Sequence, residues 1–395
     1  MGLFLIISKP VSTFLSIVVF IIWIFNTDRK TKSEFLKDPI VLAFFTYLGV
    51  LFVSMFMSDN ITEGFYVIRK HRWIILFPAI YWFVRNHRHS LRWGYITSCI
   101  FVVLFSYILY FGKWIPFLNI TRDFDYYCPY HHHVEHGILI SIGLFIFLYE
   151  VFSKKIRKKN LLIVFLPVLL VIYNILFTQG RMGQLVLILS IFFLFIYRFR
   201  KNPVRAFLYS AITIVIFIVS AYFLVPEFST RIDDFNGQVK AVFESNDKYT
   251  VGKLFNYRMW MWVTCYDIWR DNIVFGTGTG DFPAEYEKRF ESLYPKSEYV
   301  GFVDKYARNP HNYHIQVLAR TGLVGLLSWF FIFYILLRNA FRQKEYIFCI
   351  YIICTYFMIN LTDIYFQKHV FQFLFFVLIS LSYIIPKRNG KIYDQ

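Results

Sequence analysis

The amino-acid sequence predicts an all-α, polytopic membrane protein with about 11–12 transmembrane helices. Of its 395 residues, 57% are hydrophobic and only 17% are charged. Ordinary soluble domains carry about a quarter charged residues. Apolar runs of about 20 residues also recur along the chain, and this length crosses a hydrocarbon core of roughly 30 Å.

Eleven apolar runs are candidate spans. They cover residues 4–25, 39–57, 73–85, 94–112, 134–152, 161–177, 182–198, 206–225, 314–337, 346–364 and 369–386. The first run is ambiguous, because it contains Lys9 and Pro10 and proline kinks or breaks helices. Two short helices there would give twelve crossings and a cytoplasmic N-terminus, whereas a single helix would place Met1 outside.

The net charge of +17 indicates membrane orientation rather than nucleic-acid binding. Lys and Arg cluster in short connections at every second loop, for example in residues 26–38, 153–160 and 198–205. Cytoplasmic loops are enriched in these residues. The pattern therefore argues against a nucleic-acid partner, and it places the C-terminal tail in the cytoplasm and residues 227–310 outside.

Four regions follow from this topology: an N-terminal transmembrane bundle (1–226), a loop domain (227–310), C-terminal transmembrane helices (311–386) and a cytoplasmic tail (387–395). The loop domain is too long for a simple connector. We expect it to be folded, mostly helical and packed on the outer face of the membrane. Within it, residues 254–270 predict a helix at the membrane surface, with Arg258, Trp262, Tyr266 and Trp269 near one face.

Cationic residues on the outer side are candidate ligands for an anion. Arg181 lies alone in the turn "TQGRMG", Arg258 lies on the predicted surface helix, and Arg69 and Lys70 lie at the mouth of a span. Arginine presents a rigid fork of donors that matches phosphate oxygens. A group of cations on the outer side of the membrane suits a lipid-linked phosphate or diphosphate. Anchoring at lipid headgroups or surface ion pairing is the alternative for each residue.

His311 lies at the start of a late span, in "RNPHNYHIQVLARTGLVGLL". Asn309 is a good N-cap and Pro310 is favoured at the first helical position. His311 would then lie in the first helical turn, where the helix dipole disfavours imidazolium. A neutral imidazole is what a general base requires. The alternative is a histidine that only caps or anchors the helix.

Asp363 lies at the outer end of the next span, in "NLTDIYF". A carboxylate beside an apolar run is costly and is usually paired or functional. We expect it to orient His311 or to pair with an arginine; a water-facing residue at a helix end is the alternative.

Three weaker patterns have plainer interpretations. His132 and His136 have the spacing of a metal-ligand pair, but no carboxylate-rich partner set is evident, so no metal site is expected. "GTGTGDF" (276–282) lacks the Gly-Lys-Ser/Thr of a phosphate loop and is interpreted as a turn. Cys128 and Cys265 fall on the outer side and could pair there, although free thiols are the simpler expectation.

The chain resembles the O-antigen ligase family of bacterial envelope membrane proteins. The resemblance rests on His311-Asn312, nine residues, and then Gly322-Leu323-Val324-Gly325, after a long outer loop. It implies a fold of the GT-C type with twelve helices, in the bacterial inner membrane, and an active site facing the periplasm. It also implies transfer of a glycan from undecaprenyl diphosphate to the lipid A–core oligosaccharide, without a cofactor.

The resemblance assigns roles to individual residues. His311 matches the family's essential histidine, Arg181 and Arg258 resemble its two essential arginines, and Asp363 resembles a further functional acid. Asn312 shares the motif, and Arg69 and Lys70 are possible supporting residues.

The mechanism expected from these roles is metal-independent, inverting glycosyl transfer, with membrane lipids around the site. O-antigen polymerases and protein O-oligosaccharyltransferases share the architecture and stay open as alternatives. A transporter ranks last, because neither repeated halves nor midplane ionisable groups are evident.

Overall fold

The computed structural model describes residues 6–112, 127–153, 161–244, 258–293 and 309–383, and every regular element within these ranges is helical. Seven of the helices are long and apolar enough to cross a membrane, and three shorter apolar helices accompany them. The prediction of an all-α, polytopic membrane protein is therefore confirmed. Each of the eleven predicted spans coincides with a helix.

The first helix is continuous through the residues that the structure describes. α1 runs from Lys9 to Asn26, with Pro10 in its first turn. The missing N–H of proline costs nothing there, because the first N–H groups of a helix have no intrahelical partner. The described residues thus form one helix in this region rather than two, while residues 1–5 lie outside the described part.

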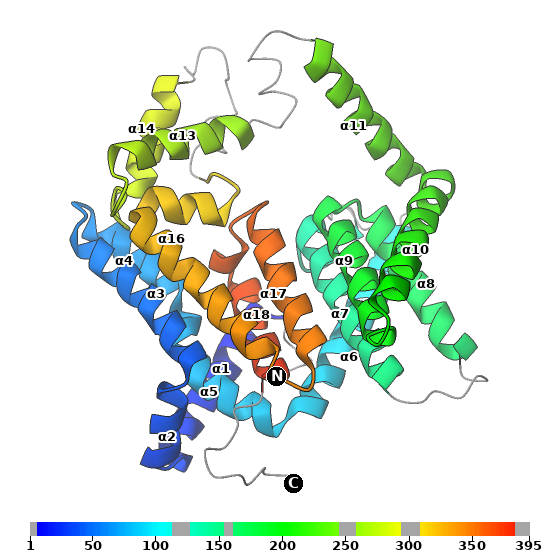
Figure 1. The fold of residues 1–395 in the computed structure, drawn as a ribbon, viewed down its shortest axis with the longest axis horizontal. Helices are drawn as coiled ribbons and strands as arrows, with labels where there is room; N and C mark the ends of the chain where they lie inside the picture. The colour runs from blue at the N-terminus through cyan, green and yellow to red at the C-terminus, as the bar shows by residue number, and fades with distance from the viewer. Residues whose placement is uncertain (1–5, 113–126, 154–160, 245–257, 294–308, 384–395) are drawn as a thin grey trace. The chain divides into compact units, whose positions relative to one another are not determined.

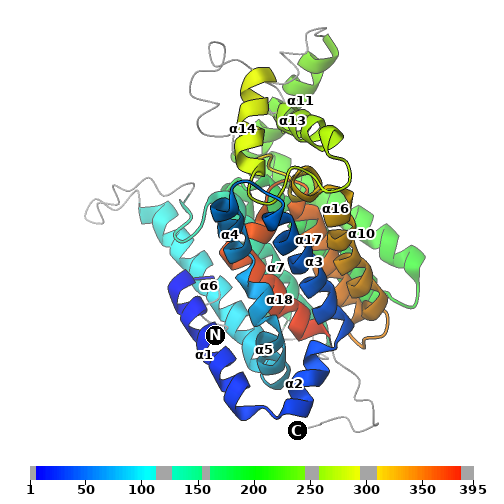
Figure 2. The ribbon, with the colours of Figure 1, turned by 90° about the vertical axis from the view of Figure 1, so that its left-hand side faces the viewer.

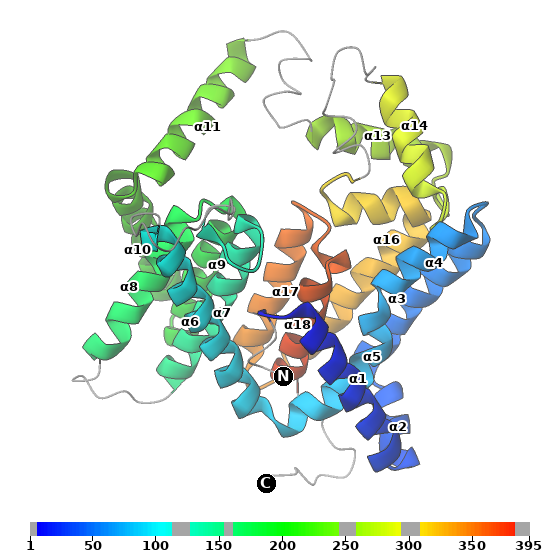
Figure 3. The same ribbon diagram turned by 180° about the vertical axis from the view of Figure 1, so that it is seen from behind.

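The chain forms two compact units. One comprises residues 1–15 and 87–241, and the other comprises residues 16–86 and 242–395. In the first unit, five long helices pack side by side (Figure 3). They are α6 (Arg88–Gly112), α7 (His133–Ser153), α8 (Leu161–Phe177), α9 (Arg181–Arg198) and α10 (Pro203–Leu224).

Helices α7 and α9 of the first unit approach each other at two glycines. A Cβ atom on Gly183 would overlap the backbone of Gly137, so the helices pack backbone to backbone there. A buried ion pair joins α6 to α7, with 2.6 Å between Arg92 Nη1 and Glu150 Oε1. Pairing of this kind is what makes buried charges tolerable in an apolar bundle.

The second unit contains the segment around His311. Its helices include α2 (Arg29–Leu36), α3 (Pro39–Phe56), α4 (Ile61–Lys70), α5 (Arg72–Asn86), α16 (Tyr313–Ala340), α17 (Tyr346–Asn360), the 3₁₀ turn η6 (Tyr365–Gln367) and α18 (His369–Ser382). Helix α16 packs along α3 and α17, and α18 packs along α5 (Figure 1). The core is strongly aromatic: the ring of Trp329 lies 4.6–5.3 Å from the rings of Tyr47, Tyr313 and Phe366.

Helix α16 is broken at Gly322, and Figure 1 shows its two pieces meeting at an angle. Gly322 has a φ of 62°, in the left-handed region that favours glycine. A side chain there would also overlap the carbonyl group of Val274. Gly322 therefore ends one helical piece and begins the next.

Residues 273–278 bond to both sides of this break. Ile273 and Val274 carbonyls accept from the N–H groups of residues 323 and 324, at 2.9 and 3.2 Å. The N–H groups of residues 277 and 278 donate to the carbonyls of residues 319 and 320, at 3.2 and 3.0 Å. Backbone groups freed by the break are thereby satisfied. The glycine-rich stretch 276–282 is thus a turn, as expected, and its role is to brace α16.

Arg320 lies in the last turn before the break and is only 3% exposed. Its guanidinium carbon lies 5.2 Å from the centre of the Phe282 ring. A cation is favoured both over an aromatic face and at the C-terminus of a helical piece. These two interactions stabilise the buried cation, while its Nε and Nη1 have no hydrogen-bond partner within the described residues.

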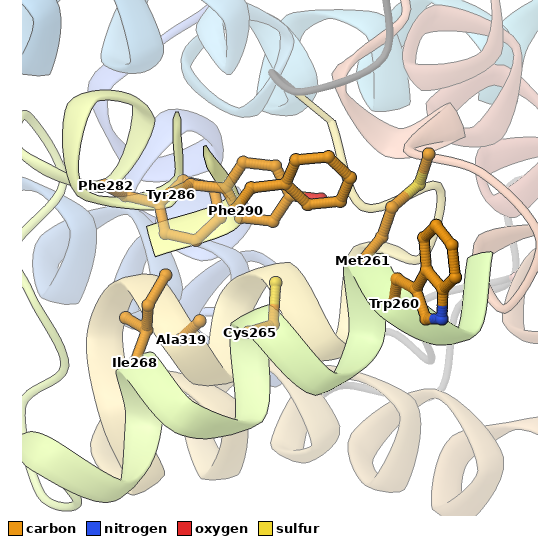
Figure 4. Packing of buried hydrophobic residues seen from close by; sticks show 8 residues of the cluster. All are labelled: Trp260, Met261, Cys265, Ile268, Phe282, Tyr286, Phe290 and Ala319. Carbon is orange, nitrogen blue, oxygen red and sulfur yellow. The ribbon is translucent and has the colours of Figure 1, made fainter. Parts of the chain in front are cut away.

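The described part of the long loop is mostly helical, in agreement with the prediction. It contains α11 (Pro226–Glu244), α13 (Arg258–Asp271) and α14 (Phe282–Leu293). In the second unit, α13 and α14 lie over the ends of α3, α4 and α16 (Figure 2). Their shared core consists of Trp260, Met261, Cys265, Ile268, Phe282, Tyr286, Phe290 and Ala319 (Figure 4). Because Ala319 belongs to α16, the loop helices are packed directly on the helix that follows His311.

Candidate functional site

The segment before α16 folds differently from the sequence-based expectation. The N-cap is Asn312, whose side chain accepts from the N–H of Ile315 at 3.1 Å, and the helix begins at Tyr313. Asn309 instead accepts from the N–H of His311 at 2.9 Å. The predicted cap at Asn309 is therefore wrong. Both asparagines are good N-caps, and the tertiary setting selects the second.

His311 consequently lies outside the helix rather than in its first turn. Its φ is 49°, an uncommon value for a residue other than glycine. The side chain is 24% exposed, so the imidazole lies at a surface rather than within the bundle. Strained backbone of this kind persists only where surrounding contacts hold it, and it is concentrated at functional sites.

Asp363 places a carboxylate beside the His311 ring. It follows α17, and its Oδ1 lies 3.2 Å from His311 Nδ1, while its Oδ2 lies 2.7 Å from Lys368 Nζ. The carboxylate is only 15% exposed. Burial raises the pKa of Asp363, but the hydrogen bond from His311 and the charge of Lys368 outweigh it and bring the pKa below its usual value. Asp363 is therefore an ionised carboxylate at neutral pH.

An ionised carboxylate beside Nδ1 has a defined effect on a neutral imidazole. Nδ1 carries the proton and donates to Asp363, so the lone pair of the ring is on Nε2. The carboxylate also stabilises the imidazolium that forms when Nε2 takes up a proton. The His311–Asp363 pair thus has the arrangement of an oriented general base.

Helix α13 is tied to the backbone beside His311. Trp262 Nε1 donates to the carbonyl of Pro310 at 3.0 Å. Arg258 lies one turn earlier on the same face of α13, and its side chain is exposed. Tyr266 continues this exposed face, as predicted, whereas Trp269 is half-buried and residues 254–257 lie outside the described part. Arg258 is accordingly placed on the α13 face that meets the His311 segment.

Arg69 and Lys70 form the last turn of α4, and both lie over the ring of Tyr66, at 5.3 and 4.3 Å from its centre. The next residue, His71, connects them to the His311 segment. His71 Nε2 accepts from the hydroxyl of Tyr313 at 2.7 Å, and Nδ1 donates to the Val67 carbonyl at 2.8 Å. The two basic residues thus immediately precede the buried contact between His71 and the first residue of α16.

His71 and His314 are buried and hydrogen-bonded. Burial, with smaller contributions from the charges of Arg320 and Lys70, lowers the pKa of His71 to about 3. His314, three residues after His311, accepts from Trp329 Nε1 at 2.9 Å through Nδ1. Of the two histidines in the "HNYH" stretch, only His311 combines partial exposure with a carboxylate partner.

Arg181 lies in the other compact unit. It is the first residue of α9, is exposed, and follows Gly180 at the N-cap. No side chain caps this helix end, although the first N–H groups of a helix favour an anion. The structure thus brings His311, Asn312, Asp363, Arg258, Arg69 and Lys70 into one unit. The association of Arg181 with them stays a prediction.

The histidine cluster near Cys128 makes contacts within its own unit. His136 Nε2 donates to Asn174 Oδ1 at 2.8 Å, and His131 Nε2 donates to the Ile6 carbonyl at 2.6 Å. Within the ranges that the structure describes, no group of three or more His, Cys, Asp or Glu side chains is placed to hold a metal ion. Cys128 and Cys265 are both buried free thiols.

Sequence reasoning missed Lys368 and His71. Lys368 follows Asp363 by five residues in the connection between α17 and α18. A cation so close to an acid at a span end was a usable signal. His71 stands among Arg69, Lys70 and Arg72, so the sequence there has the character of a basic cluster rather than of a buried imidazole.

The O-antigen ligase family model matches residues 166–330, a range that includes Arg181, Arg258, His311 and the glycines of α16. No curated protein matches the chain. The match agrees with the resemblance drawn from the His311–Gly325 motif.

Proposed function

We propose that this chain, a member of the O-antigen ligase family, transfers a glycan from undecaprenyl diphosphate to the lipid A–core oligosaccharide. The observation that carries the proposal is the His311–Asp363 pair, with 3.2 Å between Nδ1 and Oδ1. It lies beside the α16 N-cap in a multi-pass membrane protein. The active site would face the periplasm of a bacterial inner membrane, on the side opposite the basic loops.

The proposed reaction is an inverting displacement. The acceptor hydroxyl oxygen attacks the anomeric carbon and forms the new glycosidic bond, while its proton passes to His311 Nε2. The bond between the anomeric carbon and the diphosphate oxygen breaks, and the electron pair leaves with undecaprenyl diphosphate. Asp363 stabilises the imidazolium produced in this step.

Arg258 and Arg181 would neutralise the charge that develops on the leaving diphosphate. Preorganised cations at a leaving group are among the strongest contributions to catalysis. Arg258 is supported by the α13 contact with Pro310, whereas Arg181 is proposed from its place at an uncapped helix N-terminus. Since the arginines supply positive charge, purified protein should transfer glycan in excess chelator. Loss of activity with chelator and its return with one divalent ion would contradict this.

The test is His311→Ala in living cells, at matched protein level. Glycan attachment to the lipid A–core should disappear while undecaprenyl-linked glycan accumulates, because the base is absent and the donor is still made. Normal capped lipopolysaccharide in this variant would contradict the proposal. A deletion strain separates the ligase from a polymerase of the same family: loss of a ligase leaves bare core, and loss of a polymerase leaves core carrying one repeat.

A further inference from the structure

Lys368 is held beside Asp363 by the short connection between α17 and α18. Its Nζ lies 2.7 Å from Asp363 Oδ2, and also 4.5 Å from the centre of the Tyr365 ring. The backbone of this connection is fixed at both ends. The N–H of Asp363 donates to the Ile359 carbonyl at 3.2 Å, and the N–H of Phe366 donates to Asn360 Oδ1 at 2.9 Å. Asp363 and Lys368 therefore lie on a turn whose backbone is held by hydrogen bonds.

The two oxygens of Asp363 have different partners. Oδ1 faces His311 and also accepts from the N–H of Ile364 at 2.8 Å, while Oδ2 is bound by Lys368. This division fixes the rotation of the carboxylate. Without Lys368, Oδ2 would lack its cation in a site where the carboxylate is only 15% exposed.

Lys368 also changes the electrostatic field at His311. A carboxylate alone stabilises imidazolium and so keeps a proton on the base to higher pH. A cation on the far oxygen offsets part of that effect. Arg258, on the α13 face that carries Trp262, is a further cation of this unit and acts in the same direction as Lys368. Lys368 therefore reduces the negative charge that the Asp363 carboxylate presents to the imidazole.

We propose that Lys368 is a positioning residue for the transfer reaction: it binds Asp363 Oδ2, leaves Oδ1 for His311, and offsets part of the carboxylate's charge at the base. The inference rests on the proposed role of His311 as the base. Lys368 is a third exposed, and an ordinary exposed ion pair contributes little to stability. The test must therefore measure the pH dependence of transfer rather than the stability of the protein.

The experiment is the pH profile of kcat/KM for transfer in vitro, for wild type, Lys368→Met, Lys368→Arg and Asp363→Asn. In Lys368→Met the acidic limb should move up by about half to one pH unit, the effect of one charge several ångströms away in a partly hydrated site. The rate below the limb then falls about three- to tenfold, and the alkaline plateau changes less. Lys368→Arg should restore the wild-type limb. Asp363→Asn should move the limb the other way, because the anion is lost.

Lys344→Met, on the exposed connection after α16, is the matched control and should follow the wild-type profile. A uniform loss in Lys368→Met with an unmoved limb would overturn the inference in favour of a purely structural role, and a wild-type profile would also overturn it. His311→Ala in the same assay separates a failure of the inference about Lys368 from a failure of the proposed function. If His311→Ala is inactive and the limb of Lys368→Met is unmoved, only the inference about Lys368 fails. If His311→Ala is active, the proposed function fails.

Discussion

His71 and His311 lie in the same compact unit but have opposite surroundings. His71 is fully buried between a tyrosine hydroxyl and a backbone carbonyl. His311 is 24% exposed and lies beside an ionised carboxylate. Burial among neutral partners disfavours the imidazolium, whereas a carboxylate and access to water allow a proton to be taken up and released. The surroundings of His71 therefore suit a structural role, whereas those of His311 suit proton transfer.

The largest expected difference is between His311→Gln and His71→Gln. Loss of a general base lowers rates by about 10²–10⁴-fold, so His311→Gln should nearly abolish transfer while the thermal midpoint of the detergent-solubilised protein changes little. His71→Gln should cost roughly 1–3 kcal/mol of stability, because buried hydrogen-bonding groups lose their partners. Its activity per folded molecule should stay within about tenfold of wild type. The reverse pattern of rates and midpoints would refute the comparison.

The arginines extend the comparison from the base to the leaving group. Arg181→Lys and Arg258→Lys should each slow transfer by about ten- to a hundredfold, because lysine gives a point charge where arginine gives a planar fork worth roughly 1.5–3 kcal/mol. Arg29→Lys, at the start of α2, is the control and should have almost no effect. In vitro transfer by all three variants decides the matter: equal tolerance of lysine at the three positions would make Arg181 and Arg258 simple anchors.

The smallest effect concerns pH and stability. The pKa of His71 falls from 6.5 to about 3 on folding, so the unfolded chain binds a proton between these values that the folded chain excludes. The stability that depends on neutral His71 is complete above pH 6.5 and declines as pH falls towards 3, by up to about 1.4 kcal/mol per pH unit. Unfolding measured from pH 7 to pH 5 should therefore be less pH-dependent in His71→Gln. An identical pH dependence in the two proteins would argue against a neutral buried His71.

The spans were predictable because their cause is local. An apolar run of sufficient length forms a helix in a membrane, so the predicted ends at Gly112 and Phe177 coincide with the ends of α6 and α8, although α6 begins at Arg88 rather than at residue 94. The exposed and buried faces of α13 followed equally from three- and four-residue spacing.

The site was only partly predictable because its geometry depends on contacts between distant segments. Propensity does not decide whether Asn309 or Asn312 caps α16. Both are favoured N-cap residues, and Pro310 is compatible with either start of the helix. The break at Gly322 depends on residues 273–278, which are almost fifty positions away. The pairing of Lys368 with Asp363 requires the turn of η6, which no periodicity signals.

The break in α16 explains why nine residues separate Asn312 from Gly322 in the His311–Gly325 motif. The nine residues from Tyr313 to Thr321 form a separate helical piece of two and a half turns, bounded by the cap at Asn312 and the break at Gly322. Each residue added to or removed from this piece would rotate one end against the other by about 100°. Such a change would turn His311 away from Asp363 even if every side chain were kept. The piece is therefore a spacer of fixed length, and the activity of the protein should tolerate substitutions within it far better than insertions or deletions.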